Sequence, residues 1–213
     1  MSVNKQQVIE ILRRIAETLE EHKQYLTDLD AAIGDGDHGT NMSRGFGQVA
    51  EKLQNTEFDT IADVVKMTAM TLISTVGGAS GPLYGSFFLK AAGEVKDKEA
   101  VGISEFNRMF GAGAEGVRQR GKSQTGEKTM LDVLIPVHDF LLKCQEENKS
   151  GTESLHMAAQ SARILAEETK DIRATKGRAA YLGERSIGHI DPGAMSSCLM
   201  IEAISKYLME MEE

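Results

Sequence analysis

The sequence has no tryptophan, and only two of its 213 residues are cysteine. Cys144 and Cys198 lie far apart inside helical patterns, so we expect buried thiols rather than a disulfide, as in a reducing cytoplasm. No apolar run is long enough to cross a membrane, and the N-terminus lacks the hydrophobic region of a signal peptide. The net charge is −8, without a lysine- or arginine-rich stripe, which argues against direct contact with nucleic acid. We therefore expect a cytoplasmic protein.

Helical periodicity covers almost the whole chain, because apolar residues recur at spacings of three and four. Eight amphipathic helices are predicted, and they begin near residues 4, 41, 59, 80, 104, 129, 152 and 192. The first is expected to end near residue 28, and Asp59 to cap the third. Pro136 predicts a kink in the sixth helix, or a later start. Short connections and the lack of a convincing strand predict one all-α antiparallel domain over residues 1–213.

A short acidic stretch places three aspartates, Asp30, Asp35 and Asp37, among glycines. Carboxylates so close together repel one another unless positive charge lies between them. The nearest cationic residues along the chain, Lys23 and Arg44, lie outside this stretch. A bound divalent cation is the simplest remedy, and an Asp/Gly turn with solvated side chains is the alternative.

Several familiar motifs match here only in part. Residues 34–39 fit G-x-G-x-x-G, but a helix precedes them where a dinucleotide site needs a strand. Residues 116–123 fit G-x-x-x-x-G-K-[ST], but they lie at the C-terminal end of a predicted helix. An EF-hand loop counted from Asp30 or Asp35 lacks its glutamate, and cysteine and histidine are too scattered for zinc. Mg²⁺ completed by phosphates or water is the remaining possibility.

Three loops are suited to bind those phosphates. His38–Asn41 starts the second helix, where backbone N–H groups favour anions, and Gly77–Gly81 is a second glycine-rich helix start. The third loop, residues 169–192, is long for a compact domain, and its Arg178 and Arg185 would bring positive charge. Each signal is weak by itself, but together around the aspartates they favour a metal-assisted phosphate site. No nucleophile and base form a recognisable pair.

Three segments carry a resemblance to a known family. They are residues 30–42, which end in DGDHGTNM, residues 77–85 (GGASGPLYG) and residues 177–194 (GRAAYLGERSIGHIDPGA). The chain resembles the nucleotide-binding subunit L family of dihydroxyacetone kinases over essentially its whole length, in order and without large gaps. That resemblance implies an antiparallel eight-helix barrel with the nucleotide at one end.

The resemblance also implies roles for individual residues. The family's metal-binding positions match Asp30, Asp35 and Asp37, which would hold Mg²⁺ at the nucleotide phosphates. The segments that contact the phosphates match His38, Gly39, Thr40, Asn41, Ala79 and Ser80. The contacts to base and ribose match Gly121, Met130, Arg178, Asp191, Pro192 and Gly193, with a place for Arg178 nearer the phosphates left open.

The family has two versions, and the length of this chain favours the second. In the first, one long chain joins this domain to the substrate domain and uses ATP. In the second, a separate subunit keeps ADP bound, a phosphohistidine subunit of the phosphoenolpyruvate phosphotransferase system rephosphorylates it, and dihydroxyacetone on a partner subunit accepts the phosphoryl group.

Several questions stay open at the level of sequence. An ATP-dependent kinase for another triose or tetrose is an alternative, and so is a nucleotide-sensing co-regulator of a transcription factor. The sequence also does not decide the acceptor sugar, the number of metal ions, or whether the chain forms a homodimer.

Overall fold

The computed structural model describes residues 2–212, and almost all of their regular structure is helical. The α-helices are α1 Lys5–Glu21, α2 Lys23–Ile33, α3 His38–Asn55, α4 Ile61–Thr75, α5 Ser80–Gly93, α6 Ile103–Gly121, α7 Leu131–Glu146, α8 Gly151–Glu168 and α9 Pro192–Glu210. The remaining elements are the 3₁₀ segments η1 Thr169–Asp171 and η2 Arg178–Ser186 and the strands β1 Ser2–Asn4 and β2 Ala100–Gly102. The predicted all-α class is confirmed.

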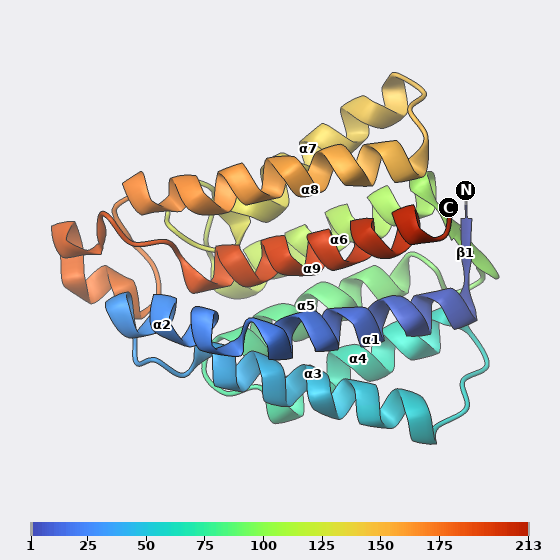
Figure 1. Ribbon diagram of the computed structural model, residues 1–213, viewed down its shortest axis with the longest axis horizontal. Helices are drawn as coiled ribbons and strands as arrows, with labels where there is room; N and C mark the ends of the chain where they lie inside the picture. The colour runs from blue at the N-terminus through green and yellow to red at the C-terminus, as the bar shows by residue number, and fades with distance from the viewer. Residues whose placement is uncertain (1, 213) are drawn as a thin grey trace.

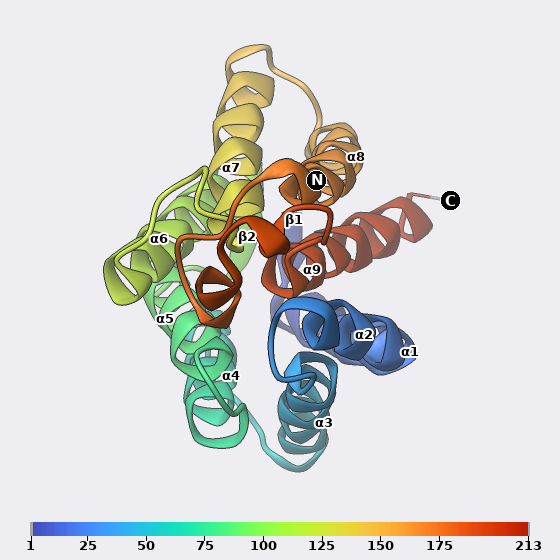
Figure 2. The ribbon, with the colours of Figure 1, turned by 90° about the vertical axis from the view of Figure 1, so that its left-hand side faces the viewer.

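The helices form a closed ring (Figure 2). Each helix packs against the next one along the chain, and α9 packs against α1, which closes the ring. α1 and α2 meet end to end at His22 and share one place, and α3 to α9 take seven more, which gives eight places. The predicted antiparallel eight-helix barrel therefore agrees with this arrangement.

Direction alternates around the ring, so every second connection lies at the same end (Figure 1). The connections α2–α3, α4–α5, α6–α7 and α8–α9 lie at the left end in Figure 1, and the described ends of the chain lie at the right. Those four connections, with the helix ends that border them, contain every segment in which the sequence places a metal or phosphate ligand. The topology thus brings together residues that are up to about 160 positions apart along the chain.

Two boundaries near the acidic stretch differ from the predicted ones. The first helix is interrupted at His22 and resumes as α2, which continues to Ile33. Asp30 therefore lies in the last turn of a helix rather than beyond its end. α3 begins at His38, not near Asn41, because the Asp30 carboxylate accepts hydrogen bonds from backbone N–H groups at the start of the helix.

Three further differences have local causes. Thr60 rather than Asp59 caps α4, because its hydroxyl accepts from the Asp63 N–H in a capping box. α7 starts at Leu131, later than expected, and retains Pro136 inside the helix. The pairing of β1 with β2 was not expected, because three-residue strands leave no readable alternation of apolar and polar residues.

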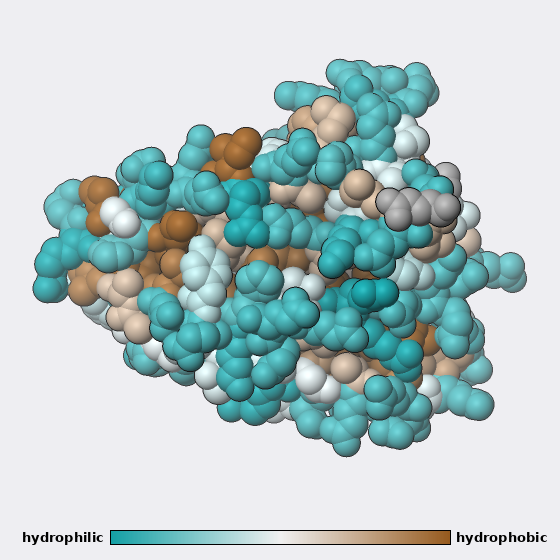
Figure 3. All heavy atoms as spheres, in the orientation of Figure 1, coloured by the Kyte–Doolittle hydropathy of each residue, from teal (hydrophilic) through white to brown (hydrophobic). Residues whose placement is uncertain are grey.

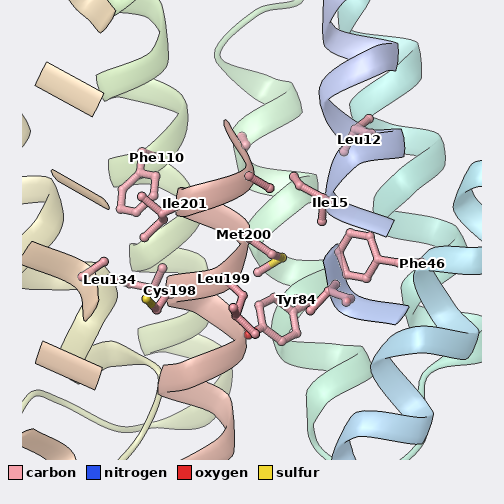
Figure 4. Packing of buried hydrophobic residues seen from close by; sticks show 14 of the residues in the cluster. Leu12, Ile15, Phe46, Tyr84, Phe110, Leu134, Cys198, Leu199, Met200 and Ile201 are labelled. Carbon is pink, nitrogen blue, oxygen red and sulfur yellow. The ribbon is translucent and has the colours of Figure 1, made fainter. Parts of the chain in front are cut away.

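The interior of the barrel is apolar. Figure 4 shows side chains from α1, α3, α5, α6, α7 and α9 converging there, among them Phe46, Tyr84 and Phe110. Burial of one such side chain contributes about 1.5–3 kcal/mol, and an apolar cavity of about 150 Å³ remains between them. The two cysteines are buried and unpaired, as expected.

The face of the barrel seen in Figure 3 is mostly hydrophilic, with scattered apolar side chains. Among residues 2–212, no helix has both the length and the apolar character needed to cross a membrane.

Candidate metal and phosphate site

The four connections at the left end of Figure 1 surround a hollow of about 440 Å³. Most of the sequence-predicted site residues line it, namely Asp30, Asp35, Asp37, His38, Ala79, Ser80, Gly121, Met130, Arg178, Asp191, Pro192 and Gly193. Figure 2 looks onto this end of the barrel. Gly39, Thr40 and Asn41 are not among the residues that line the hollow, although they follow His38 directly.

The carboxylates of Asp30, Asp35 and Asp37 form one cluster, in which one ligand oxygen of each lies within 4.8 Å of the others. Asp30 is buried, and its Oδ2 accepts hydrogen bonds from the N–H groups of Asp37 (2.9 Å) and His38 (3.1 Å). Its Oδ1 faces Gly34, where a Cβ would overlap it. Three carboxylates in this arrangement supply the hard oxygen donors that Mg²⁺ prefers, so the residues fit that ion.

A cation from a distant part of the chain also reaches the cluster. Arg178, the first residue of η2, places its Nη2 2.9 Å from Asp35 Oδ2. Both side chains are partly open to solvent, so the pair by itself contributes little to stability. Its position matters more, because it puts the guanidinium at the carboxylate side of the hollow rather than at the side formed by Gly121 and Met130.

Two hydroxyl groups lie within hydrogen-bond distance of the ring nitrogens of His38, one of them buried (Ser196) and one half-buried (Ser80). Nε2 lies 2.9 Å from Ser196 Oγ, and Nδ1 lies 3.2 Å from Ser80 Oγ. Burial lowers the pKa of His38 to about 4, although Asp30 and Asp37 oppose the shift. The imidazole is therefore neutral at ordinary pH and holds the Ser80 hydroxyl at the edge of the hollow. It is also a weak base, so it does not activate the Ser80 hydroxyl as a nucleophile. This agrees with the sequence, in which no nucleophile and base form a recognisable pair.

The same network continues into the barrel through Tyr84. Its hydroxyl lies 2.7 Å from Ser196 Oγ and 2.9 Å from Ser197 Oγ, and it donates to the Gly193 carbonyl oxygen at 3.2 Å. Burial raises the pKa of Tyr84, so the phenol stays protonated. Sequence reasoning missed this network. The available signal was the Ser196–Ser197 pair, two adjacent hydroxyls within the apolar run from Ala194 to Ile201.

Of the three predicted residues outside the hollow, Gly39 and Asn41 make contacts within the protein, and Thr40 is open to solvent. Gly39 lies against α2, where a Cβ would overlap the Lys23 carbonyl oxygen and approach Thr27 N to 2.7 Å. Asn41 accepts a hydrogen bond from Arg44 Nη2 at 2.7 Å, and Thr40 is exposed. Arg185, which the sequence offered as a second source of positive charge, does not line the hollow either.

Asp191 ends the long connection and caps α9, where its Oδ2 accepts from the Ala194 N–H at 2.7 Å. Pro192 takes the first helical position, as its fixed φ favours. Burial raises the pKa of Asp191 to about 7, since the hydrogen bond from Ala194 only partly offsets the loss of solvent. Lys128 also lines this side of the hollow, and nothing in its sequence context had indicated that it would.

The fold and the site together define a helical barrel with a cluster of three carboxylates beside a hollow at one end of its ring. Residues 32–206 match the DAK2 domain, and the chain belongs to that family. It is 45% identical over 205 residues to the Escherichia coli K12 protein named PEP-dependent dihydroxyacetone kinase, ADP-binding subunit DhaL. The match covers 96% of this chain and 98% of the relative. The resemblance to the subunit L family is confirmed.

Two further comparisons agree. The Lactococcus lactis protein named PTS-dependent dihydroxyacetone kinase, ADP-binding subunit DhaL, is 44% identical over 196 residues, with 92% of this chain and 94% of the relative covered. The crystal structure of the dihydroxyacetone kinase from C. freundii in complex with AMP-PNP and Mg²⁺ is similar, with a TM-score of 0.72 and 25% identity. That likeness covers 97% of this chain but 34% of the larger kinase chain.

Proposed function

We propose that this chain is the ADP-binding subunit of a phosphoenolpyruvate-dependent dihydroxyacetone kinase. The observation that carries the proposal is the end-to-end 45% identity with the Escherichia coli subunit of that name. The three-carboxylate cluster beside a hollow of about 440 Å³ supports it, because a nucleoside diphosphate needs space to bind and its cation needs oxygen ligands. In this proposal residues 1–213 act as one nucleotide-binding domain.

The acidic turn would hold the cation. When bound at Asp30, Asp35 and Asp37, Mg²⁺ would neutralise the charge that the phosphates carry. Asp30 is already oriented by its two backbone hydrogen bonds, so it costs little further ordering to bind the ion. The similar C. freundii kinase structure, a complex with AMP-PNP and Mg²⁺, supports this choice of metal.

The remaining residues divide between the two sides of the hollow. Ala79 and Ser80, at the start of α5, would present backbone N–H groups and a fixed hydroxyl to the phosphates, and Arg178 would add charge there. The base and ribose would take the side formed by Gly121, Met130, Asp191, Pro192 and Gly193. Direct phosphate contacts from Gly39, Thr40 and Asn41 stay a prediction.

The proposed reaction needs partners. Phosphoryl transfer depends mainly on positioning and charge neutralisation, and this site offers no activated nucleophile. The acceptor hydroxyl and its base would therefore belong to a dihydroxyacetone-holding subunit, and the phosphoryl group would come from a phosphohistidine carrier. We place this assembly in the cytoplasm.

Reconstitution tests the proposal. The purified chain is mixed with the dihydroxyacetone-holding subunit and given either phosphoenolpyruvate with the phosphotransferase carriers or ATP alone. We expect dihydroxyacetone phosphate only in the first arm, and none when the partner subunit is omitted. Equal product from ATP alone would identify an ATP-dependent kinase instead, and no product in either arm would contradict the proposal.

A further inference from the structure

Within residues 2–212, one lysine or arginine side chain is buried, and it is Lys128, which is 1% exposed. Lysine is almost never fully buried unless its ammonium has partners. The backbone of Lys128 is also left-handed, with φ of 62°. That conformation is uncommon for a residue other than glycine. Two uncommon features at one residue indicate a tertiary constraint.

The partners of the Lys128 ammonium are three backbone carbonyl oxygens of the connection between α8 and α9. Nζ donates to the oxygens of Thr169 (2.6 Å) and Ile172 (3.1 Å), at the start of this connection, and to that of His189, near its end. One side chain from the α6–α7 connection therefore joins both ends of a loop that departs from the barrel and returns to it (Figure 1). We call residues 169–191 the capping loop.

Two other contacts close the base of the capping loop. The Gly188 N–H donates to the Lys170 carbonyl at 2.7 Å, and the Asp191 N–H donates to Thr169 Oγ1 at 2.9 Å. Neither of them ties the loop to another part of the barrel, because all four residues belong to the loop itself. The Thr175 N–H, which donates to the Glu127 carbonyl at 3.3 Å, and the packing of Ala174 and Ala179 on Ile33 tie the middle of the loop to the barrel. Lys128 supplies such a tie at both ends of the loop, and its ammonium carries a charge that strengthens each of its hydrogen bonds.

The capping loop carries Arg178, whose guanidinium meets Asp35 across the hollow. It ends at Asp191, which caps α9 on the other side. A change at the base of the loop therefore alters the position of both groups relative to the acidic cluster. Burial lowers the pKa of Lys128, whereas Asp191, Asp132 and Asp171 favour the charged form.

We propose that Lys128 is a positioning residue that fixes the capping loop over the hollow and thereby slows the release of the nucleotide bound beneath it. The inference rests on the proposed nucleotide site and assigns that site a determinant of its residence time. Lys128 acts through the loop rather than by contact with the phosphates. Its loss is expected to increase the rate of nucleotide release more than it decreases the rate of association.

The test compares Lys128→Met with Lys122→Met. Methionine keeps the length and apolar stem of lysine but donates no hydrogen bonds. Lys122 is a matched control, since it lies in the same connection and also has a left-handed backbone, with φ of 48°, but its side chain is exposed. Hydrogen–deuterium exchange of residues 170–190 is measured on ligand-free protein, and release of a fluorescent ADP analogue with Mg²⁺ is followed by stopped flow.

For Lys128→Met we expect faster exchange throughout residues 170–190, unchanged exchange in α1 and α4, and release that is about tenfold faster, as for the loss of hydrogen bonds to a charged group. Lys122→Met should behave as wild type. Lys128→Arg, which keeps a cation with several donors, should restore release to within about threefold of wild type. Should Lys128→Met not fold, Lys128→Gln replaces it.

Unchanged loop exchange in Lys128→Met would overturn the inference whether or not the protein binds ADP. Faster loop exchange with unchanged release would overturn it as well, and so would faster exchange in α1 and α4 to the same extent, since that marks a general loss of stability. A wild-type protein that binds no ADP would instead refute the proposed function, and the exchange data would still report separately on the loop.

Discussion

The two sides of the hollow are built in different ways. The acidic turn is held by contacts between near neighbours, because Asp30 accepts from N–H groups seven and eight residues further on. The capping loop is held by contacts with residues far along the chain, among them Lys128, 41 to 61 residues away. It meets the acidic side through the Arg178–Asp35 pair and through the packing of Ala174 and Ala179 on Ile33. The first side is thus shaped before any ligand arrives, whereas the second depends on tertiary contacts that can open without unfolding the barrel.

The largest expected effect comes from the preformed side. Asp35→Asn removes one carboxylate of the cluster and the partner of Arg178, so we expect the affinity for Mg²⁺-ADP to fall about 100-fold or more, equivalent to about 2.8 kcal/mol. Calorimetric titration measures it, and circular dichroism should show unchanged helix content. Asp28→Asn is the control, because Asp28 is exposed and its carboxylate accepts a hydrogen bond from Gln24 at 2.8 Å, away from the cluster. Equal losses in both variants would contradict the metal assignment.

Close packing of α3 on α2 is the second point at which the acidic turn can be broken. Gly39→Ala places a Cβ onto the Lys23 carbonyl oxygen, and neither backbone segment can shift easily. We expect a loss of about 2.5 kcal/mol in the free energy of unfolding, measured by urea denaturation. Gly47→Ala is the matched control in the same helix, because a Cβ there meets no atom within 4 Å. It should stabilise the protein by about 0.5–1 kcal/mol, and a loss there as large as for Gly39→Ala would refute the packing argument.

The return end of the capping loop should make stability depend on pH. Burial raises the pKa of Asp191 from 3.8 to about 7, so between these values the folded state holds a proton that the unfolded state has released. The free energy of unfolding therefore falls as the pH rises from about 4 to 7. Three pKa units correspond to about 4 kcal/mol, and solvent screening reduces this to about 2 kcal/mol.

Asp191→Asn removes that titration and keeps an acceptor for the N-cap. Denaturation of both proteins at pH 5 and pH 7.5 measures the contribution, since the other groups titrate in both. The stability of wild type relative to the variant should fall by about 2 kcal/mol at the higher pH. If the free energies of unfolding of the two proteins changed equally between pH 5 and pH 7.5, Asp191 would be ionised in the folded protein over this whole range.

The smallest effect should come from the pair that joins the two sides. Arg178→Ala removes a solvent-exposed guanidinium from the carboxylate side of the hollow, so we expect affinity for Mg²⁺-ADP to fall about tenfold, or about 1.4 kcal/mol, without loss of folding stability. Arg173→Ala serves as control, because Arg173 pairs with Glu184 within the capping loop and should change affinity less than about twofold. A nearly unchanged affinity in Arg178→Ala would place this residue outside the nucleotide contacts.

The same contrast explains what could be predicted from the sequence. The helices and the acidic turn were predictable because their signals are local, namely apolar spacing, caps, and three aspartates within eight positions. The start of α3, which the sequence predicted three residues too late, also has a local cause. The sequence shows that Asp30 lies near residue 38, but not that its carboxylate accepts hydrogen bonds from the backbone at the start of the next helix.

The rest of the site was not predictable because its partners are distant in sequence. Nothing near Lys128 indicates a buried ammonium, since its acceptors are backbone carbonyls of the capping loop, which carry no side-chain signature. The links from His38 to Ser80 and Ser196 likewise depend on three helices that meet only in the closed ring. The metal and nucleotide contacts themselves remain predictions.

Calorimetric titration of the wild-type protein with ADP, after removal of any bound nucleotide, tests the central claim most directly. It is carried out once with Mg²⁺ and once with EDTA. If the aspartate cluster holds the cation that binds the phosphates, ADP should bind tightly with Mg²⁺ and about 100-fold or more weakly with EDTA. Equal affinity under both conditions, or no binding in either, would contradict the account.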